Sequence, residues 1–217
     1  MIQRSQLERA KYEEGDEHFR IDIAPRNGYN KIIRRGDIIS CDTGINYFGL
    51  GTDTQQNAYV LKVGETEVPA GLQKAFNNTN KLQIAIANEF EIGRPAGEVV
   101  NASLRTAKAA GLDAKIYGHP LPYNLLRYGL NGGFHKIRYA AGPELGGEAI
   151  GRVQEFSEEG GYPIYANTTY AMEIDTMTNV PEWGNQNVRI VMEENVAMTD
   201  EGFVFLGGRQ TDWYIIE

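Results

Sequence analysis

The sequence contains little cysteine and histidine and no long apolar run. Cys41 is its one cysteine, and three histidines are present among 217 residues. A single cysteine excludes an intrachain disulfide framework and any CxxC zinc or redox site, so a metal would need oxygen and nitrogen ligands. Neither a run of about 18 apolar residues nor the apolar core of a signal peptide occurs, so we expect no membrane partner. The chain as given is expected to be cytoplasmic; the alternative is a secreted precursor that has lost its N-terminus.

Basic residues are also in deficit. Lys and Arg number 21 against 29 Asp and Glu, which gives a formal net charge of -8. Nucleic-acid binding requires a basic face that neutralises phosphates, so no nucleic-acid partner is expected. An excess of carboxylates can instead hold cations. With 41% hydrophobic residues, the composition is that of an ordinary globular protein that buries its own core.

The order of the periodic segments predicts an α+β fold. Asp37 begins a hairpin of two strands, IISCDTGINYF and TDTQQNAYVLKV. Helical spacing follows over residues 69–91 and over EVVNASLRTAKAAG, which ends at Gly111. DAKIYGHP predicts a short strand that ends at His119, and TTYAMEIDT, NVRIVMEENVAMT and GFVFLG predict three strands of an antiparallel sheet. Strands, two helices and strands again are typical of α+β proteins.

Two segments have little periodicity. Residues 1–33 predict a polar helix over 3–14 and an irregular lead-in, which we interpret as the remnant of a longer domain, separate from a main domain at 34–217. Residues 120–166 are rich in Gly, Pro and Tyr. A structureless loop of that length is uncommon inside a compact domain, so we expect unrecognised strands within it.

Four acids interrupt apolar strand sequences: Asp42, Asp53, Glu173 and Glu193. A lone acid in a strand commonly faces solvent, and that is the plain alternative for each of them. If the four share a face, cations must relieve their mutual repulsion. His119 adds an imidazole, although a single histidine is more often structural. Together these side chains suit a pair of Mn, Co, Fe or Zn ions in a hydrolase.

The order of these motifs resembles the pita-bread metallopeptidases. CDTGINYFGLGTD is followed by GHP, YAMEI and VRIVMEENVAMTDEG, as in methionine aminopeptidase, aminopeptidase P, prolidase and creatinase. The likeness extends from about Arg34 to the C-terminus and is closest to the Xaa-Pro aminopeptidase-like branch, which TDTQQNAYVL, VPEWGNQ and GGRQT resemble. The resemblance implies a pita-bread fold, an antiparallel curved sheet with helices on its outer face, and a catalytic domain at 34–217.

The resemblance also implies a ligand for every position of a dinuclear metal centre. Asp42 would bind one ion, Asp53 and Glu193 would bridge two, and His119 and Glu173 would complete the second. The two divalent ions would be Mn, Co, Zn or Fe, and no other cofactor is implied.

Two neighbours of Glu193 carry separate expectations. Glu194 should face the opposite side of the strand, because successive side chains alternate. Arg189 should share the face of Glu193 and is predicted to orient a ligand carboxylate through an ion pair.

The activity implied by the resemblance is metal-dependent hydrolysis of Xaa-Pro bonds by an aminopeptidase or dipeptidase. A water bridging the two ions would attack the scissile carbonyl, and Glu173 would pass its proton to the leaving amine. The expected partner is a peptide substrate, with a homodimer as one assembly option.

One segment departs from the family pattern. Pro122 stands where close relatives place Gly, and Tyr139 stands where a second His is expected. Either His135 or Tyr139 supplies that hydrogen-bond donor, or the donor is absent and activity is weakened.

Three alternatives stay open at this point. Asp42-Thr43-Gly44 matches the nucleophilic-water motif of aspartic proteases, but only one copy is present, so a symmetric dimer would be needed. A binding protein that keeps the scaffold without catalysis is the second alternative. Creatinase-like amidino hydrolysis, which uses the same architecture, is the third.

Overall fold

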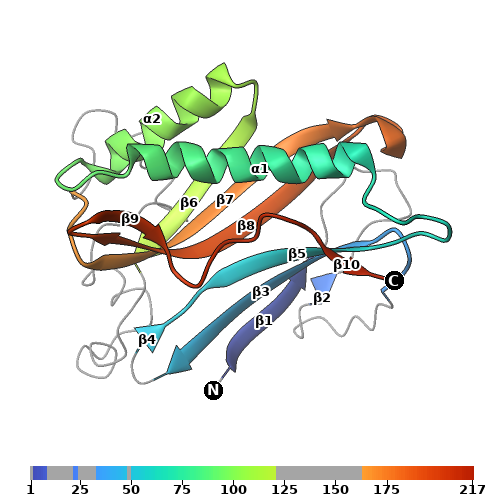
Figure 1. Ribbon diagram of the computed structural model, residues 1–217, viewed down its shortest axis with the longest axis horizontal. Helices are drawn as coiled ribbons and strands as arrows, with labels where there is room; N and C mark the ends of the chain where they lie inside the picture. The colour runs from blue at the N-terminus through green and yellow to red at the C-terminus, as the bar shows by residue number, and fades with distance from the viewer. Residues whose placement is uncertain (1, 9–21, 24–32, 48–49, 121–162) are drawn as a thin grey trace.

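A computed structural model describes residues 2–8, 22–23, 33–47, 50–120 and 163–217 of the protein. These residues form one large curved β-sheet with two α-helices, α1 and α2, packed on one of its faces (Figure 1). The predicted α+β class and the predominantly antiparallel sheet are therefore confirmed.

The strands follow the order β2-β1-β3-β5-β8-β7-β6 across the sheet, and β4, β9 and β10 pair with β3, β8 and β5. Their bounds are β1 Ile2–Glu8, β2 Asp22–Ile23, β3 Ile38–Tyr47, β4 Leu50–Gly51, β5 Thr54–Val60, β6 Asp113–Pro120, β7 Thr168–Val180, β8 Gln186–Thr199, β9 Gly202–Phe205 and β10 Tyr214–Ile216. The predicted hairpin is formed by β3 and β5, and β7, β8 and β9 are the three predicted C-terminal strands. Strand β10, which was not predicted, pairs with β5 in parallel.

The predicted helix over residues 3–14 is wrong where the structure describes it. Residues 2–8 form strand β1, which pairs with β3 in antiparallel register, for example Ser5 opposite Thr43. The backbone of β3 needs a partner along this edge, and strand pairing overrides local helix propensity there. Residues 9–21 lie outside the described residues, and the boundary between 1–33 and 34–217 stays a prediction.

Both predicted helices are present, as α1 (Ala70–Glu89) and α2 (Ala96–Ala109). Helix α2 stops before Gly111, whose φ of 73° is the left-handed conformation that favours glycine. Helix α1 follows Pro69, which supplies no side-chain cap. Its Gly71 N–H instead donates to Glu182 Oε1 at 2.8 Å, from the short helix η2 (Pro181–Trp183).

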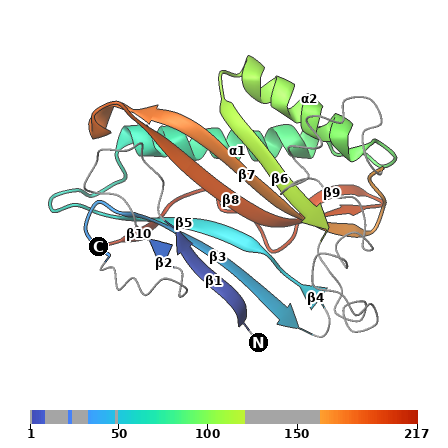
Figure 2. The ribbon, with the colours of Figure 1, turned by 180° about the vertical axis from the view of Figure 1, so that it is seen from behind.

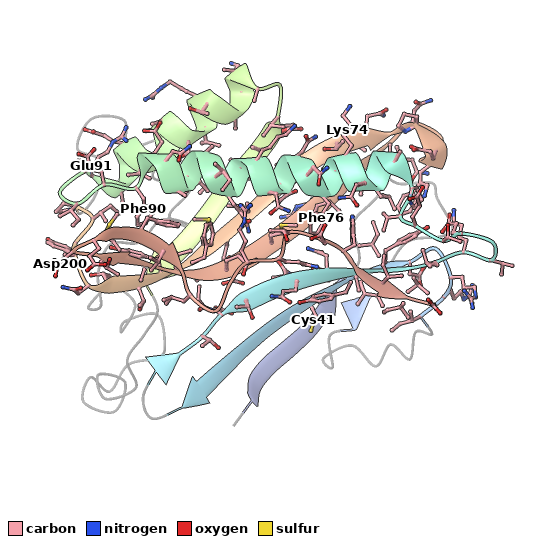
Figure 3. The ribbon with its side chains drawn as sticks, viewed as in Figure 1. Cys41, Lys74, Phe76, Phe90, Glu91 and Asp200 are labelled. Atoms are coloured by element: carbon pink, nitrogen blue, oxygen red, sulfur yellow. The ribbon has the colours of Figure 1, made fainter. Side chains whose placement is uncertain are left out.

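The hydrophobic core lies between α1, α2 and the sheet. Phe76 projects from α1 toward the sheet, as does Phe90, which directly follows the helix, whereas Lys74 projects from the outer side of α1 (Figure 3). The core side chains from β7 are Tyr170, Met172, Ile174 and Val180. None of the described helices has the length and apolar character needed to cross a membrane.

The alternation of side chains along β7 places Glu173 on the face of the sheet opposite the helices. Even-numbered residues such as Ile174 face the helices, so odd-numbered ones such as Glu173 point to the other side. We call this second side, which carries Glu173 and Glu193, the acidic face. Figure 2 views the molecule from this side, with β6, β7 and β8 in front of α1.

Candidate metal centre

Strand register places four residues in one row across the sheet. Glu173 of β7 lies opposite Glu193 of β8, and Glu193 lies opposite Gln55 of β5. Gln55 in turn lies opposite Asp42 of β3. Three of the five predicted ligands therefore occupy this row at the level of the backbone.

The fourth predicted ligand lies close to the same row. Residue Tyr117 of β6 is paired with Glu173, and His119 follows two residues later, opposite Ala171. The structure describes the backbone of Asp42 and His119 but not their side chains. Their roles as ligands stay predictions.

Three carboxylates converge on the acidic face. Asp53, Glu173 and Glu193 each offer one oxygen, and these oxygens lie within 4.8 Å of one another. Glu193 is buried, with 4% of its surface exposed, and the other two are half-buried. Like charges this close repel one another unless a cation neutralises them, and carboxylate oxygens suit divalent ions. The donor chemistry of the cluster therefore fits the predicted metal centre.

The three carboxylates come from different parts of the fold. Glu173 and Glu193 stand in the interiors of β7 and β8, whereas Asp53 directly precedes β5. The backbone N–H of Asp53 donates to Asn195 Oδ1 at 3.0 Å. Sequence reasoning missed Asn195, although its position two residues after Glu193 already predicts that the two share a face.

Glu194 lies on the helix-covered side of the sheet, as predicted. Its side chain is buried, and Oε1 accepts a hydrogen bond from the backbone N–H of Gln210 at 2.8 Å. Burial raises the pKa of the Glu194 carboxyl. Glu194 is therefore no part of the cluster, although it adjoins Glu193 in sequence.

Arg189 forms an ion pair with a residue that sequence reasoning did not single out. Its Nη2 lies 2.6 Å from Asp175 Oδ2, and the Asp175 side chain is only 4% exposed. Asp175 follows Glu173 by two residues and so shares its face. Since Asp175 is not a predicted ligand, the predicted contact of Arg189 with a ligand carboxylate stays a prediction.

His135 and Tyr139, the two candidates for the second hydrogen-bond donor, lie outside the described residues. The same holds for Pro122. Their assignment stays a prediction from the sequence.

Several solved structures share this fold. The prolidase from Thermococcus sibiricus matches with a TM-score of 0.61 and 14% identity, covering 98% of this chain and 47% of that one. The dipeptidase from Pyrococcus horikoshii matches with a TM-score of 0.58 and 17% identity, covering 98% of this chain and 48% of that one. The X-Pro aminopeptidase from Thermotoga maritima matches with a TM-score of 0.58 and 15% identity, covering 87% of this chain and 44% of that one. At this identity the likeness establishes the fold, and the chain spans less than half the length of each.

The predicted pita-bread fold is confirmed by these neighbours. No curated protein matches the sequence significantly. The sequence profile of metallopeptidase family M24 matches residues 18–200, which include all five predicted ligand positions. Because this match spans most of the sequence, the chain belongs to metallopeptidase family M24.

Proposed function

We propose that the protein is a dinuclear metal-dependent peptidase, an aminopeptidase or dipeptidase that cleaves Xaa-Pro bonds. The observation that carries this proposal is the convergence of the Asp53, Glu173 and Glu193 carboxylates within 4.8 Å. Membership of family M24 supports the metallopeptidase class. The structures of similar fold include an X-Pro aminopeptidase, a dipeptidase and a prolidase, which supports the choice of bond.

Asp53, Glu173 and Glu193 would hold two divalent cations together with Asp42 and His119. When bound, such cations supply a Lewis acid and lower the pKa of water toward neutrality. Mn, Co, Zn and Fe all fit a site of oxygen and nitrogen ligands.

Glu173 is the residue to which we assign proton transfer. It is half-buried, and the hydrogen-bonded interior of β7 holds its backbone in place. Its carboxylate would accept a proton from the attacking water and return it to the leaving amine. Glu193, the most buried of the three, would supply the ligand oxygen that is least accessible to solvent.

Peptide hydrolysis by the purified protein tests this proposal. An Xaa-Pro dipeptide and an Xaa-Pro-Yaa tripeptide are supplied with Mn²⁺, Co²⁺ or Zn²⁺, with and without a chelator. Cleavage of the dipeptide indicates a dipeptidase, and cleavage of the tripeptide indicates an aminopeptidase. We expect Glu173→Gln to lower kcat by about 100- to 10,000-fold, the range typical of a lost general acid or base.

Glu194→Gln is the matched control, because it changes the same residue type next to the cluster but on the helix-covered side. Its activity should stay near that of the wild type. A protein that binds metal but cleaves neither peptide would refute the peptidase proposal and favour the binding scaffold without catalysis.

A further inference from the structure

Strands β5 and β8 pair with each other, and we call this pairing the joint. It brings Asp53 to the carboxylates of Glu173 and Glu193. The two strands are paired at Gln55 opposite Glu193. In an antiparallel pair this register places Asp53 beside Asn195 on one side, and Asn57 beside Val191 on the other. The carboxylate cluster therefore includes residues from both sides of this joint.

Side-chain amides hold the strands together at both flanking positions. Asn195 Oδ1 accepts from the Asp53 backbone N–H at 3.0 Å, and Asn57 Nδ2 donates to the Val191 carbonyl at 2.8 Å. Beside Asn57, the Gln210 side chain accepts from the Asn57 N–H and donates to its carbonyl, each at 2.7 Å, as a neighbouring strand would. The Asn195 amide thus binds the Asp53 backbone at a position that lies just before β5, outside the regular strand.

Asn195 is well placed to fix Asp53. It is buried, with 6% of its surface exposed, and its own carbonyl accepts from the Leu206 N–H at 2.8 Å. It follows Glu193 by two residues in β8, so it shares the acidic face with Glu193 and Glu173. One residue therefore connects the backbones of two proposed bridging ligands that are distant in sequence.

We propose that Asn195 is a positioning residue of the metal centre, whose amide oxygen holds the Asp53 backbone so that the Asp53 carboxylate reaches the cations shared with Glu193. This inference rests on the proposed function, since it requires cations at the cluster. Groups that orient metal ligands typically change metal affinity by about 10- to 100-fold when they are removed. Asn195→Ala should cause a loss of that size.

Asn57 offers a matched control. It is the same residue type, is 1% exposed, and also joins β5 to β8 by a side-chain amide, two residues from the central pair. Its side chain donates to the backbone of Val191, whereas that of Asn195 accepts from the backbone of Asp53, a residue of the cluster. Asn57→Ala should lower the melting temperature and leave the metal affinity unchanged.

The experiment is calorimetric titration of the purified full chain with Mn²⁺, with the absorption spectrum of bound Co²⁺ as a second readout. Wild type is compared with Asn195→Ala, Asn195→Gln, Asn195→Asp and Asn57→Ala, and each melting temperature is recorded. Asn195→Gln keeps the amide but displaces its oxygen, so it should lose affinity like Asn195→Ala. Asn195→Asp keeps the acceptor at the same reach and should restore binding.

The failures of the two proposals are distinguishable. If wild type binds neither Mn²⁺ nor Co²⁺, the metal-dependent function and this inference both fail. If wild type binds Mn²⁺ and the folded Asn195→Ala or Asn195→Gln variant binds it equally well, only the positioning role is refuted. An equal loss of affinity in Asn57→Ala would also refute it, because general loosening of the joint would then explain the effect.

Discussion

Repulsion among the Asp53, Glu173 and Glu193 carboxylates favours the binding of cations by their cluster. Three carboxylate oxygens within 4.8 Å, with Glu193 nearly buried, form a strongly anionic site. Divalent cations are the natural counterparts of such a site. Each carboxylate is therefore expected to contribute to metal binding.

Asp53→Asn and Glu193→Gln should each lower the content of bound divalent metal, because each removes a negative charge and one anionic ligand oxygen. Metal analysis of the purified proteins after dialysis measures this content. Glu194→Gln, on the other side of the same strand, should keep the content of the wild type. Equal metal in wild type and both cluster variants would contradict the bridging roles.

The choice of these residues followed from acids within apolar strand sequences. That signal singled out Asp53, Glu173 and Glu193, and the structure brings their carboxylate oxygens within 4.8 Å of one another. It did not identify Asp175 or Asn195, because an ion pair and an amide contact leave no mark on hydrophobic periodicity. Asp175 became recognisable once the register of β7 and β8 was known, and Asn195 once the pairing of β5 with β8 was known.

Helix α1 depends on a partner outside its own sequence. Its first turn contains no acidic residue, and Glu182 accepts the Gly71 N–H from the far end of β7. A Cβ at Gly71 would lie 2.8 Å from Val180 Cγ1, so the close approach requires glycine there. This contact fixes the start of α1 over the sheet.

Glu182→Ala should lower the free energy of unfolding by about 0.5–2 kcal/mol, the usual cost of a lost helix cap. Glu182→Gln retains an acceptor and loses only the attraction of a charge to the helix dipole, so its cost should be smaller, about 0.3–1 kcal/mol. Urea denaturation at neutral pH compares both with wild type. Two variants as stable as wild type would show that the cap contributes nothing.

Periodicity predicted both helices and the long strands because these elements are defined locally. It failed at β1, whose residues Ile2–Glu8 are mostly polar and take their conformation from pairing with β3. It also missed β10, which has three residues and depends on β5 for its hydrogen bonds. Both errors concern strands that only a distant partner stabilises.

The helices and the sheet together bury two tyrosines of the core completely. Burial raises the pKa of Tyr170 from 10.0 to about 12 and also raises the pKa of Tyr59. As the pH rises from about 10 to about 12, the unfolded chain loses the Tyr170 proton while the folded chain keeps it. Folding stability is therefore intact below about pH 10 and declines above it.

Tyr170→Phe should make stability less sensitive to alkaline pH, since no proton remains to be lost at this position. Urea unfolding at about pH 9 and pH 11 measures the decline in wild type and variant. Tyr214→Phe is the control, because Tyr214 is 55% exposed. The expectation fails if wild type and Tyr170→Phe lose the same free energy between the two pH values.

The amino-acid sequence by itself determined that Glu173 and Glu193 lie within strands and that Glu194 faces away from Glu193, because the two-residue alternation of a strand is a local property. Only the tertiary structure decided that Asp53 lies beside them. Its N–H meets Asn195 across a separation of 142 residues, and the pairing of β5 with β8 that permits this depends on long-range packing. The candidate site is thus encoded in part locally, and it is completed where the two halves of the sheet meet.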